Sequence, residues 1–406
     1  MTHFIGFALG VLLAIAVAAE AQTMFSMPEH CLGCHEGALT PTSAEGKEPV
    51  TPEATPIEKK LGFTSYGDLR LRYELDWDSL NTAGAMRASR NRGRLRARAG
   101  FNYQVSEAWS FGGRVRSGST HSQQSPHLTF AGDDGVRDNA SVVADRYFVQ
   151  FNHRAFSVWG GRDTSPFWQQ NELFWDEDVT STGVAGAYQM RIGPGNVTAT
   201  AGAFYVPDGG YRLNGQMTAG QLKYSLASKR SQFTFASGLH YLHGRKGARY
   251  LLNRDGERDY LIGVNSAQWS VPVKKVPLIL GADLFHNFMD YGSADVAPFP
   301  ATERNQTLGY ALSAQLGQLK KHCGWLAGYC YAHIERFAVN ASYAQDDWIR
   351  FGNGTQTEAS DFQGSEMRSG YAVSRNVNLL ARLYLVQAIG TRQNGSRFRL
   401  DLNWKF

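Results

Sequence analysis

From Phe63 to the last residue, apolar and polar positions alternate along the chain. In the segment FTSYGDLRLRYELDWD, leucines and aromatic residues take every second position, and charged residues take the positions between them. Because successive side chains of a β-strand point to opposite faces, this period of two predicts a strand with one apolar and one polar face. The segment RGRLRARAGFNYQV repeats the pattern, with four arginines on its polar face.

We count about sixteen such segments between residue 62 and the C-terminus. Short turns such as SEAW, IGPG and VKK alternate with long loops, as they do in bacterial outer-membrane barrels, whose short turns face the periplasm. The long loops are expected at residues 79–91, 120–144, 163–182, 244–257, 289–305 and 335–363. The pattern therefore predicts an all-β fold: an antiparallel outer-membrane β-barrel of about 16 strands over residues 62–406.

The C-terminus supports the same fold. Phe406 closes an alternating strand through Leu400, Leu402 and Trp404, and a terminal aromatic residue is typical of outer-membrane proteins. Because the first strand begins and the last strand ends beside short turns, we expect the N-terminus and the C-terminus on the periplasmic side. A soluble β-sandwich is the alternative, but it does not need roughly 345 residues of strands that are each near ten residues long.

The composition fits an all-β protein and excludes one class of partner. The chain of 406 residues contains 43 glycines and 12% aromatic residues, which is expected of many strands joined by turns. The formal net charge of +5 is small, and no run of basic residues stands out. We therefore expect no nucleic-acid partner.

Residues 1–21 form an apolar run, MTHFIGFALGVLLAIAVAAEA, that ends in the pattern A-x-A. This is the form of a secretory signal peptide, so we expect the mature chain to begin at Gln22. A retained membrane anchor is the alternative, but the apolar stretch from Phe4 to Ala19 is short for a helix that spans a bilayer. The protein is therefore predicted to be exported.

Shortly after the signal peptide comes the motif C-x-x-C-H, formed by Cys31, Cys34 and His35. This spacing predicts one covalent haem c, because the two thiols add to the haem vinyl groups and the adjacent histidine becomes an axial ligand of the iron. A disulfide would give His35 no role, a zinc site would need further ligands, and a thioredoxin-like pair would need a βαβ context. Met27 is a candidate for the sixth ligand, and an open sixth position is the alternative.

We interpret residues 22–40 as a monohaem cytochrome c segment and residues 41–61, which are rich in proline, threonine and glutamate, as a linker. Such a short segment cannot bury a haem within a core of its own. We therefore expect the barrel to cover the haem, either at its periplasmic mouth or inside the lumen.

Arginines gather on the polar faces of the first, second, third and last strands, which are neighbours in a closed barrel. They predict a basic wall on one side of the lumen. The wall consists of Arg70, Arg72, Arg92, Arg94, Arg96, Arg98, Arg114, Arg116, Arg397 and Arg399. A long loop carries Asp176, Glu177 and Asp178, which would constrict the pore if the loop folds inward.

Two interpretations of these charges stay open. The first is a diffusion porin with an electric field across its lumen. In the second, the wall holds the haem propionates, because arginine matches carboxylates bidentately, and the acidic loop attracts a cation such as ferrous iron.

The segments GDLRLRYE, RNRGRLRARAGF, FSVWGGRDTSPFW and LFWDEDVTSTGVAG resemble the "putative porin" family of Gram-negative outer membranes, over nearly all of residues 62–406. Together with the N-terminal C-x-x-C-H, the whole chain resembles monohaem cytochrome–porin fusions. The best-known members oxidise ferrous iron at the cell surface and pass electrons inward. In this second resemblance, Cys31, Cys34 and His35 match the haem motif of the family, but no residues match an iron site. The resemblance implies that the barrel lies in the outer membrane and is surrounded by lipid.

The sequence thus leads to two expected functions. The first is an electron conduit, in which the haem carries electrons between an extracellular donor or acceptor and a periplasmic cytochrome. Ferrous iron is a candidate for the extracellular donor. Such a protein needs no general acid, base or nucleophile, because the cofactor does the chemistry. The alternative is a general or anion-preferring diffusion porin whose haem serves docking or redox sensing.

Overall fold

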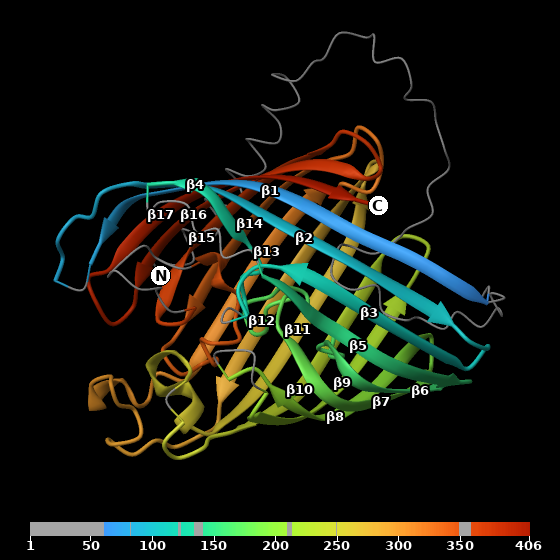
Figure 1. The fold of residues 1–406 in the computed structure, drawn as a ribbon, viewed down its shortest axis with the longest axis horizontal. Coiled ribbons are helices and arrows are strands. Elements are labelled where there is room, and N and C mark those ends of the chain that lie inside the picture. The colour runs from blue at the N-terminus through green and yellow to red at the C-terminus, as the bar shows by residue number, and fades with distance from the viewer. Residues whose placement is uncertain are drawn as a thin grey trace, which may run out of the picture.

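A computed structural model describes residues 61–81, 83–120, 123–133, 141–208, 213–248, 250–348 and 359–406. The predicted signal peptide, the haem motif and all but the last residue of the predicted linker lie outside the described residues. The described chain forms one antiparallel sheet that closes into a barrel (Figure 1).

In the described ranges, the barrel wall contains seventeen strands. They are β1 (Gly62–Leu80), β2 (Arg90–Gln104), β3 (Trp109–Ser117), β4 (Leu128–Gly132), β5 (Val142–His153), β6 (Phe156–Thr164), β7 (Thr180–Ile192), β8 (Gly195–Val206), β9 (Gly215–Ala227), β10 (Gln232–His243), β11 (Tyr260–Val273), β12 (Val276–Asn287), β13 (Leu308–Gly317), β14 (Trp325–Ile334), β15 (Phe362–Ala372), β16 (Val377–Ala388) and β17 (Asn394–Lys405). Short 3₁₀ helices lie in the loops, at Leu252–Glu257, Ala301–Glu303 and Asp346–Trp348. No helix in the described part of the chain is long and apolar enough to cross a bilayer.

Strand β17 pairs with β1, so the first and last strands close the barrel. The pairing runs from Asp68 opposite Lys405 to Leu80 opposite Asn394. Just beyond it, the backbone N–H groups of Gly67 and Phe406 each donate to the carbonyl oxygen of the other residue, at 2.9 and 3.0 Å. A Cβ at Gly67 would lie 2.5 Å from the Phe406 ring. Glycine is therefore needed where the terminal aromatic ring packs on the first strand.

The predicted all-β antiparallel barrel is confirmed, with one strand more than the sequence indicates, while the predicted haem segment lies outside the described residues. Strand β2 pairs with β3 along one half of its length and with β4 along the other half. Because β3 and β4 share one position, the seventeen strands fill sixteen positions in the wall. Strand β4 lies within the stretch expected to be a loop, 120–144, because its five residues are too few to show a period. The described residues 118–120 and 123–127 lie between the two halves and are here named the third-strand insertion.

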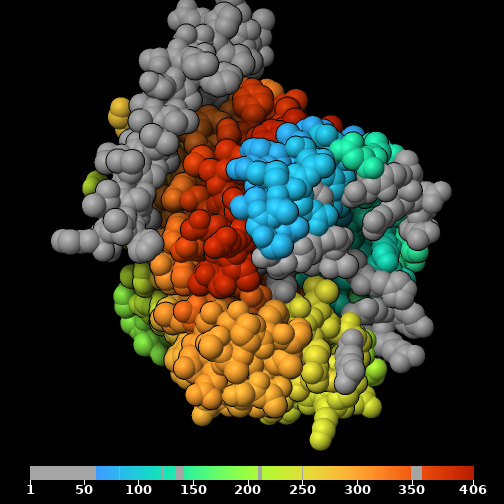
Figure 2. Space-filling model, turned by 90° about the vertical axis from the view of Figure 1, so that its left-hand side faces the viewer, coloured from blue at the N-terminus to red at the C-terminus, as the bar shows by residue number. Residues whose placement is uncertain are grey.

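Short turns and long loops occupy opposite ends of the barrel. Strand β1 begins at the short-turn end, where Gly62 lies opposite Gln104 and the turn 105–108 follows. The other end gathers the long loops, including 244–259 and 288–307. Figure 2 shows this end, with the loops in yellow and orange covering the lower part of the mouth.

Side chains alternate across the barrel wall, with apolar residues outside and charged residues inside. On β1, Tyr73 is 44% exposed, whereas the next residue, Glu74, is fully buried. On β17, Leu400 is 40% exposed and Asp401 is fully buried. An apolar exterior around a charged lumen is the arrangement expected of a barrel that lies in lipid.

Two long loops enter the barrel and contribute to its apolar core. Trp175, from the loop between β6 and β7, stacks on Tyr343, from the loop that follows β14, with ring centroids 5.1 Å apart. Trp348 of the second loop stacks on Phe362 of β15 at 5.5 Å. All four side chains belong to one buried apolar cluster that joins the loops to the strands. We name these segments the first inner loop (residues 165–179) and the second inner loop (residues 335–348).

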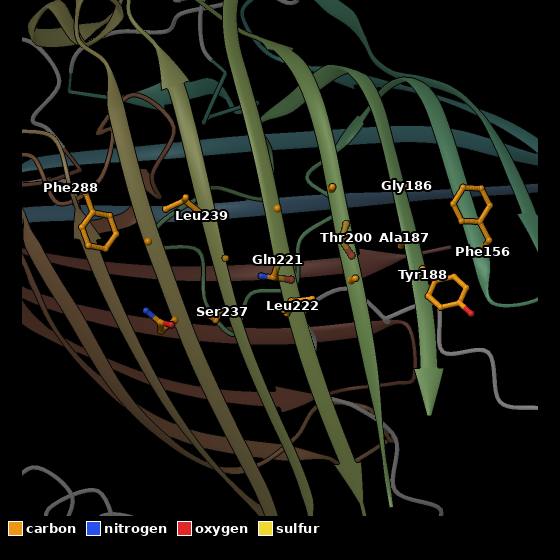
Figure 3. Close-up of a pocket in the computed structure, with 16 residues that line it drawn as sticks. Phe156, Gly186, Ala187, Tyr188, Thr200, Gln221, Leu222, Ser237, Leu239 and Phe288 are labelled. Atoms are coloured by element: carbon orange, nitrogen blue, oxygen red, sulfur yellow. The ribbon is translucent and has the colours of Figure 1, made fainter. Parts of the chain in front are cut away.

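The outer face has a shallow hollow of about 700 Å³ across β6 to β11, bordered by Phe288 after β12 (Figure 3). Gly186, Ala201 and Gly220 lie opposite one another on neighbouring strands and form its floor. Tyr188 and Leu222 stand beside this row. The wall is indented here because the floor residues have little or no side chain.

Leu222, near the middle of β9 and 60% exposed, provides a test of the lipid-facing exterior. We expect Leu222→Arg to lower the free energy of unfolding from lipid by about 2–4 kcal/mol, because a guanidinium would then face hydrocarbon. The control, Leu222→Ala, removes the same side chain without adding charge and should cost less. Urea unfolding in phospholipid vesicles measures both losses. Equal losses for the two variants would mean that this face does not lie in lipid.

Candidate functional site

The structure places the predicted basic wall on adjacent strands around the closing seam. Along β1 and β2, Arg70 lies opposite Arg96, and Arg72 lies opposite Arg94. Strand β17 joins on the other side of β1, and β3 follows β2. The lumen therefore has one side on which arginines from four strands lie side by side.

Carboxylates on the same strands pair with these arginines. Arg72 donates to both carboxylate oxygens of Asp401, at 2.6 and 3.0 Å. Arg399 donates to Glu74 at 2.7 Å, and Arg114 to its partner on β5, Asp145, at 2.7 Å. The wall is thus a network of opposite charges instead of an uninterrupted row of cations. The alternation in the sequence could have predicted this pairing, because the acidic residues fall on the same polar strand faces as the arginines.

The first inner loop carries its acidic residues to the wall. Asp178 accepts hydrogen bonds from Arg98 at 2.8 Å and from Arg96 at 3.2 Å. Glu177 lies 3.4 Å from Arg96, and Arg98 and Arg96 lower the Glu177 pKa to about 2 against the opposing effect of burial. Because the Glu177 side chain is 46% exposed, burial raises its pKa less than the two guanidiniums lower it.

Asp176, the third acidic residue of that loop, does not reach the arginines. Its carboxylate accepts a hydrogen bond from the backbone N–H of Asp178 at 2.7 Å. Burial and the neighbouring carboxylates of Glu172 and Asp178 raise the Asp176 pKa well above its usual range. The Asp283 carboxylate on β12 anchors the loop, accepting hydrogen bonds from two of its amide side chains.

The second inner loop contributes a carboxylate that the sequence analysis did not single out. Asp347 accepts hydrogen bonds from Arg399 and, at 3.1 Å, from Arg382, and it lies 3.7 Å from Arg72. Burial opposes its ionisation, but Arg399 and Arg72 outweigh burial and hold the Asp347 pKa below its usual range. No periodic pattern marks a loop residue as lumenal, so only the folded chain identifies it.

The third-strand insertion also reaches inward and ties the segments together. Gln123 donates to the Ser342 carbonyl oxygen at 2.6 Å, and Gln124 donates to the Ala341 carbonyl oxygen at 3.0 Å. The two inner loops bond directly to each other, from the Asp176 N–H to the Tyr343 carbonyl oxygen at 2.8 Å. The three segments thus bond to one another and to the arginine wall, and we name this region the constriction.

The predicted haem ligands Cys31, Cys34, His35 and Met27 lie outside the described residues. Within the described ranges, no group of three histidine, cysteine or acidic side chains could hold a metal ion. The acidic loop therefore gains no support as an iron site, since Asp178 and Glu177 pair with arginines. Cys323 and Cys330, the two cysteines of the described residues, are not joined by a disulfide, and neither the sequence nor the fold assigns them a role.

Asp347 and its neighbour Asp346 allow a matched test of the constriction. We expect Asp347→Asn to lower the free energy of unfolding at pH 7 by about 3 kcal/mol, because three arginines lose a shared buried carboxylate. Asp346→Asn should leave stability unchanged or raise it, since burial and Asp347 raise the Asp346 pKa and disfavour its charge. Urea titrations of the refolded barrel measure both.

The pH dependence supplies a second readout. Since the folded pKa of Asp347 is depressed, its contribution is fully present above the ordinary aspartate pKa of 3.8 and is lost as the pH falls through the folded value. The stability gap between wild type and Asp347→Asn should therefore close only in strong acid. A gap that does not change with pH, or equal losses in both variants, would contradict the pairing.

Comparisons with known proteins agree with this fold. A family profile described as "Putative porin" matches residues 80–245. The structure is similar to Pseudomonas putida OprB at high pH, with a TM-score of 0.54 and 12% identity over 85% of this chain and 94% of that chain. It is also similar to Salmonella typhi OmpF in complex with daunomycin, with a TM-score of 0.51 and 11% identity over 85% of this chain and 97% of that one. Among curated proteins, none matches the sequence. These likenesses show a porin-like barrel fold.

Proposed function

We propose that this protein is an outer-membrane porin whose lumen admits small solutes past an arginine-lined constriction and favours anions. The apolar exterior of the closed barrel and the porin family match support an outer-membrane location. The arginine wall is the single observation that carries the proposal. Charged side chains that line a narrow lumen decide which ions pass.

The balance of charges favours anions. Strands β1, β2 and β17 place nine arginines on the lumen side, while seven carboxylates of the described residues lie within 4.0 Å of them. The wall consequently keeps a positive excess after pairing. Low-dielectric walls focus such a field along the lumen, which raises the local concentration of anions.

Ion selectivity in a planar lipid bilayer tests the proposal. Under a KCl gradient we expect a reversal potential that corresponds to several-fold preference for chloride, because the wall attracts anions. Glu177→Gln should shift the potential further toward anions, since this half-exposed carboxylate faces the constriction. Glu107→Gln, in the exposed turn 105–108, removes the same charge away from the lumen and should leave the potential unchanged. A preference for cations, or no conductance, would refute the proposed function.

We further infer that the N-terminal segment carries one haem c, bound through Cys31 and Cys34 with His35 as an axial ligand; Met27 is the candidate sixth ligand, and an open sixth position is the alternative. The C-x-x-C-H spacing, in a chain predicted to be exported, supports this inference. A bound haem would supply one-electron chemistry. The described barrel favours docking or redox sensing over haem binding in the lumen, because loops enter the lumen and most wall arginines already pair with carboxylates.

The electron conduit is the second candidate function, and the same motif is the observation that favours it. In this role the haem would link an extracellular donor, such as ferrous iron, with a periplasmic cytochrome.

Visible spectra and haem-stained denaturing gels test the cofactor. We expect covalent haem bands that disappear in the double variant Cys31→Ser, Cys34→Ser and persist in the control Cys323→Ser, Cys330→Ser. With the barrel oriented in vesicles, a ferrous chelate too large to enter the lumen, added to the outer face, should leave the haem oxidised if the porin function holds. Rapid reduction from that face would establish the conduit instead, and a protein without haem would contradict the motif's prediction.

A further inference from the structure

Within the described part of the chain, Arg70 and Arg94 have no carboxylate at hydrogen-bonding distance, unlike the other seven lumen arginines of β1, β2 and β17. Arg70 donates through Nε to Asn403 at 2.7 Å, and Arg94 donates through Nη2 to Ser125 at 2.8 Å. The nearest carboxylate to Arg94 is Glu74, at 3.7 Å, and Glu74 already accepts shorter hydrogen bonds from two other arginines. Both guanidiniums therefore keep unused capacity to bind an anion.

The register of the sheet brings these two arginines together. Arg72 lies opposite Arg94 and Arg70 lies opposite Arg96, so Arg70 and Arg94 are diagonal neighbours on the lumen side. Diagonal neighbours in an antiparallel pair have Cα atoms about 7–8 Å apart, within reach of long side chains. Two guanidiniums can thus approach one small ligand from adjacent strands.

The third-strand insertion adds a third donor to the same place. The Ser125 hydroxyl that accepts from Arg94 lies 3.4 Å from Nδ1 of His127. If this hydroxyl gives its hydrogen to Nδ1, the neutral imidazole carries its own N–H at Nε2. Burial, together with the guanidiniums of Arg72 and Arg94, lowers the His127 pKa well below its usual range, so the ring is neutral at pH 7.

Buried polar nitrogens of this group have no hydrogen-bond partner within the described structure. These atoms include Nε of Arg94 and Nε2 of His127. A buried donor that stays unsatisfied costs about 1–3 kcal/mol, so native proteins rarely leave several at one place without a ligand or ordered water. Positive charge and unpaired N–H donors together call for a ligand that supplies oxygen acceptors and negative charge.

We propose that Arg70, Arg94 and His127 form a binding site for a small oxyanion, a carboxylate or a phosphate, in the lumen. The proposal rests on the porin function and deepens it by naming the class of solute that pauses at the constriction. Guanidinium forks match the paired oxygens of such ions, and the imidazole N–H supplies a further donor. Chloride has no such geometry and should pass with weaker binding.

The third-strand insertion explains why the site lies beside Arg94 on β2. Strands β3 and β4 occupy one position in the wall, and the chain leaves the sheet between them. That detour carries Ser125 and His127 to the arginines of β2. If β3 and β4 were one uninterrupted strand, Ser125 and His127 would not reach the arginines, and the site would lack its third donor.

Block of chloride current by added inorganic phosphate tests the site in the full-length protein. We expect phosphate to reduce the current with a saturable concentration dependence. Arg94→Gln and His127→Gln should each weaken the apparent affinity at least tenfold, because each removes a donor. Arg94→Lys should keep the selectivity for anions but lose most of the affinity, since lysine keeps the charge without the fork. Arg375→Gln, in the exposed turn 373–376, removes an arginine outside the lumen and should change neither quantity.

Acetate in place of phosphate distinguishes the two sources of oxyanion, because block by acetate alone identifies a carboxylate site.

Anion-selective current without saturable block by either ion, or equal affinity in wild type and both glutamine variants, would overturn the site and leave the porin function intact. Absence of current would refute the porin function by itself. Equilibrium dialysis of labelled phosphate and acetate against the detergent-solubilised protein then decides the site separately: binding that Arg94→Gln abolishes supports it, and no binding overturns it. Heat-dependent gel mobility verifies that each variant is folded.

Discussion

The pairing of buried arginines with carboxylates across neighbouring strands is the interaction on which the rest of this structure depends. An isolated charge buried in a protein interior costs several kcal/mol, so a lumen lined by charged residues is stable only when they meet partners. At the closing seam, Arg72 faces Asp401 and Glu74 faces Arg399. The same contacts therefore close the barrel and determine the character of its lumen.

This requirement also explains the course of the inner loops. The strands at the seam supply more arginines than carboxylates, and Asp178 and Asp347 from the two inner loops make up part of the difference. Each of these aspartates contacts more than one guanidinium. The loops are consequently held across the lumen by the excess charge of the wall, and the constriction is an electrostatic consequence of the strands around it.

Function is expected where this network is incomplete. Most arginines of the wall hydrogen-bond to carboxylates, whereas Arg70 and Arg94 donate to uncharged side chains near the neutral His127. A wall in which every charge was neutralised would stabilise the barrel but would offer little to a passing ion. The positive charge that remains after pairing is the basis of the proposed preference for anions. It is concentrated near the third-strand insertion, where Arg94 and His127 lie.

The sequence by itself determined the strands, their two faces and the alternation of turns and loops, because a period of two and turn residues are local properties of the chain. It also marked the arginines as lumenal, and it contains the C-x-x-C-H motif, from which a haem is predicted because the motif's residues are close neighbours in the chain. It did not reveal β4, which is too short to be periodic, nor the inward course of the second inner loop. Only the tertiary structure paired Arg72 with Asp401, 329 positions apart, and brought Asp347 and His127 to the wall. Such partners are chosen by register and by barrel closure, which no local pattern encodes.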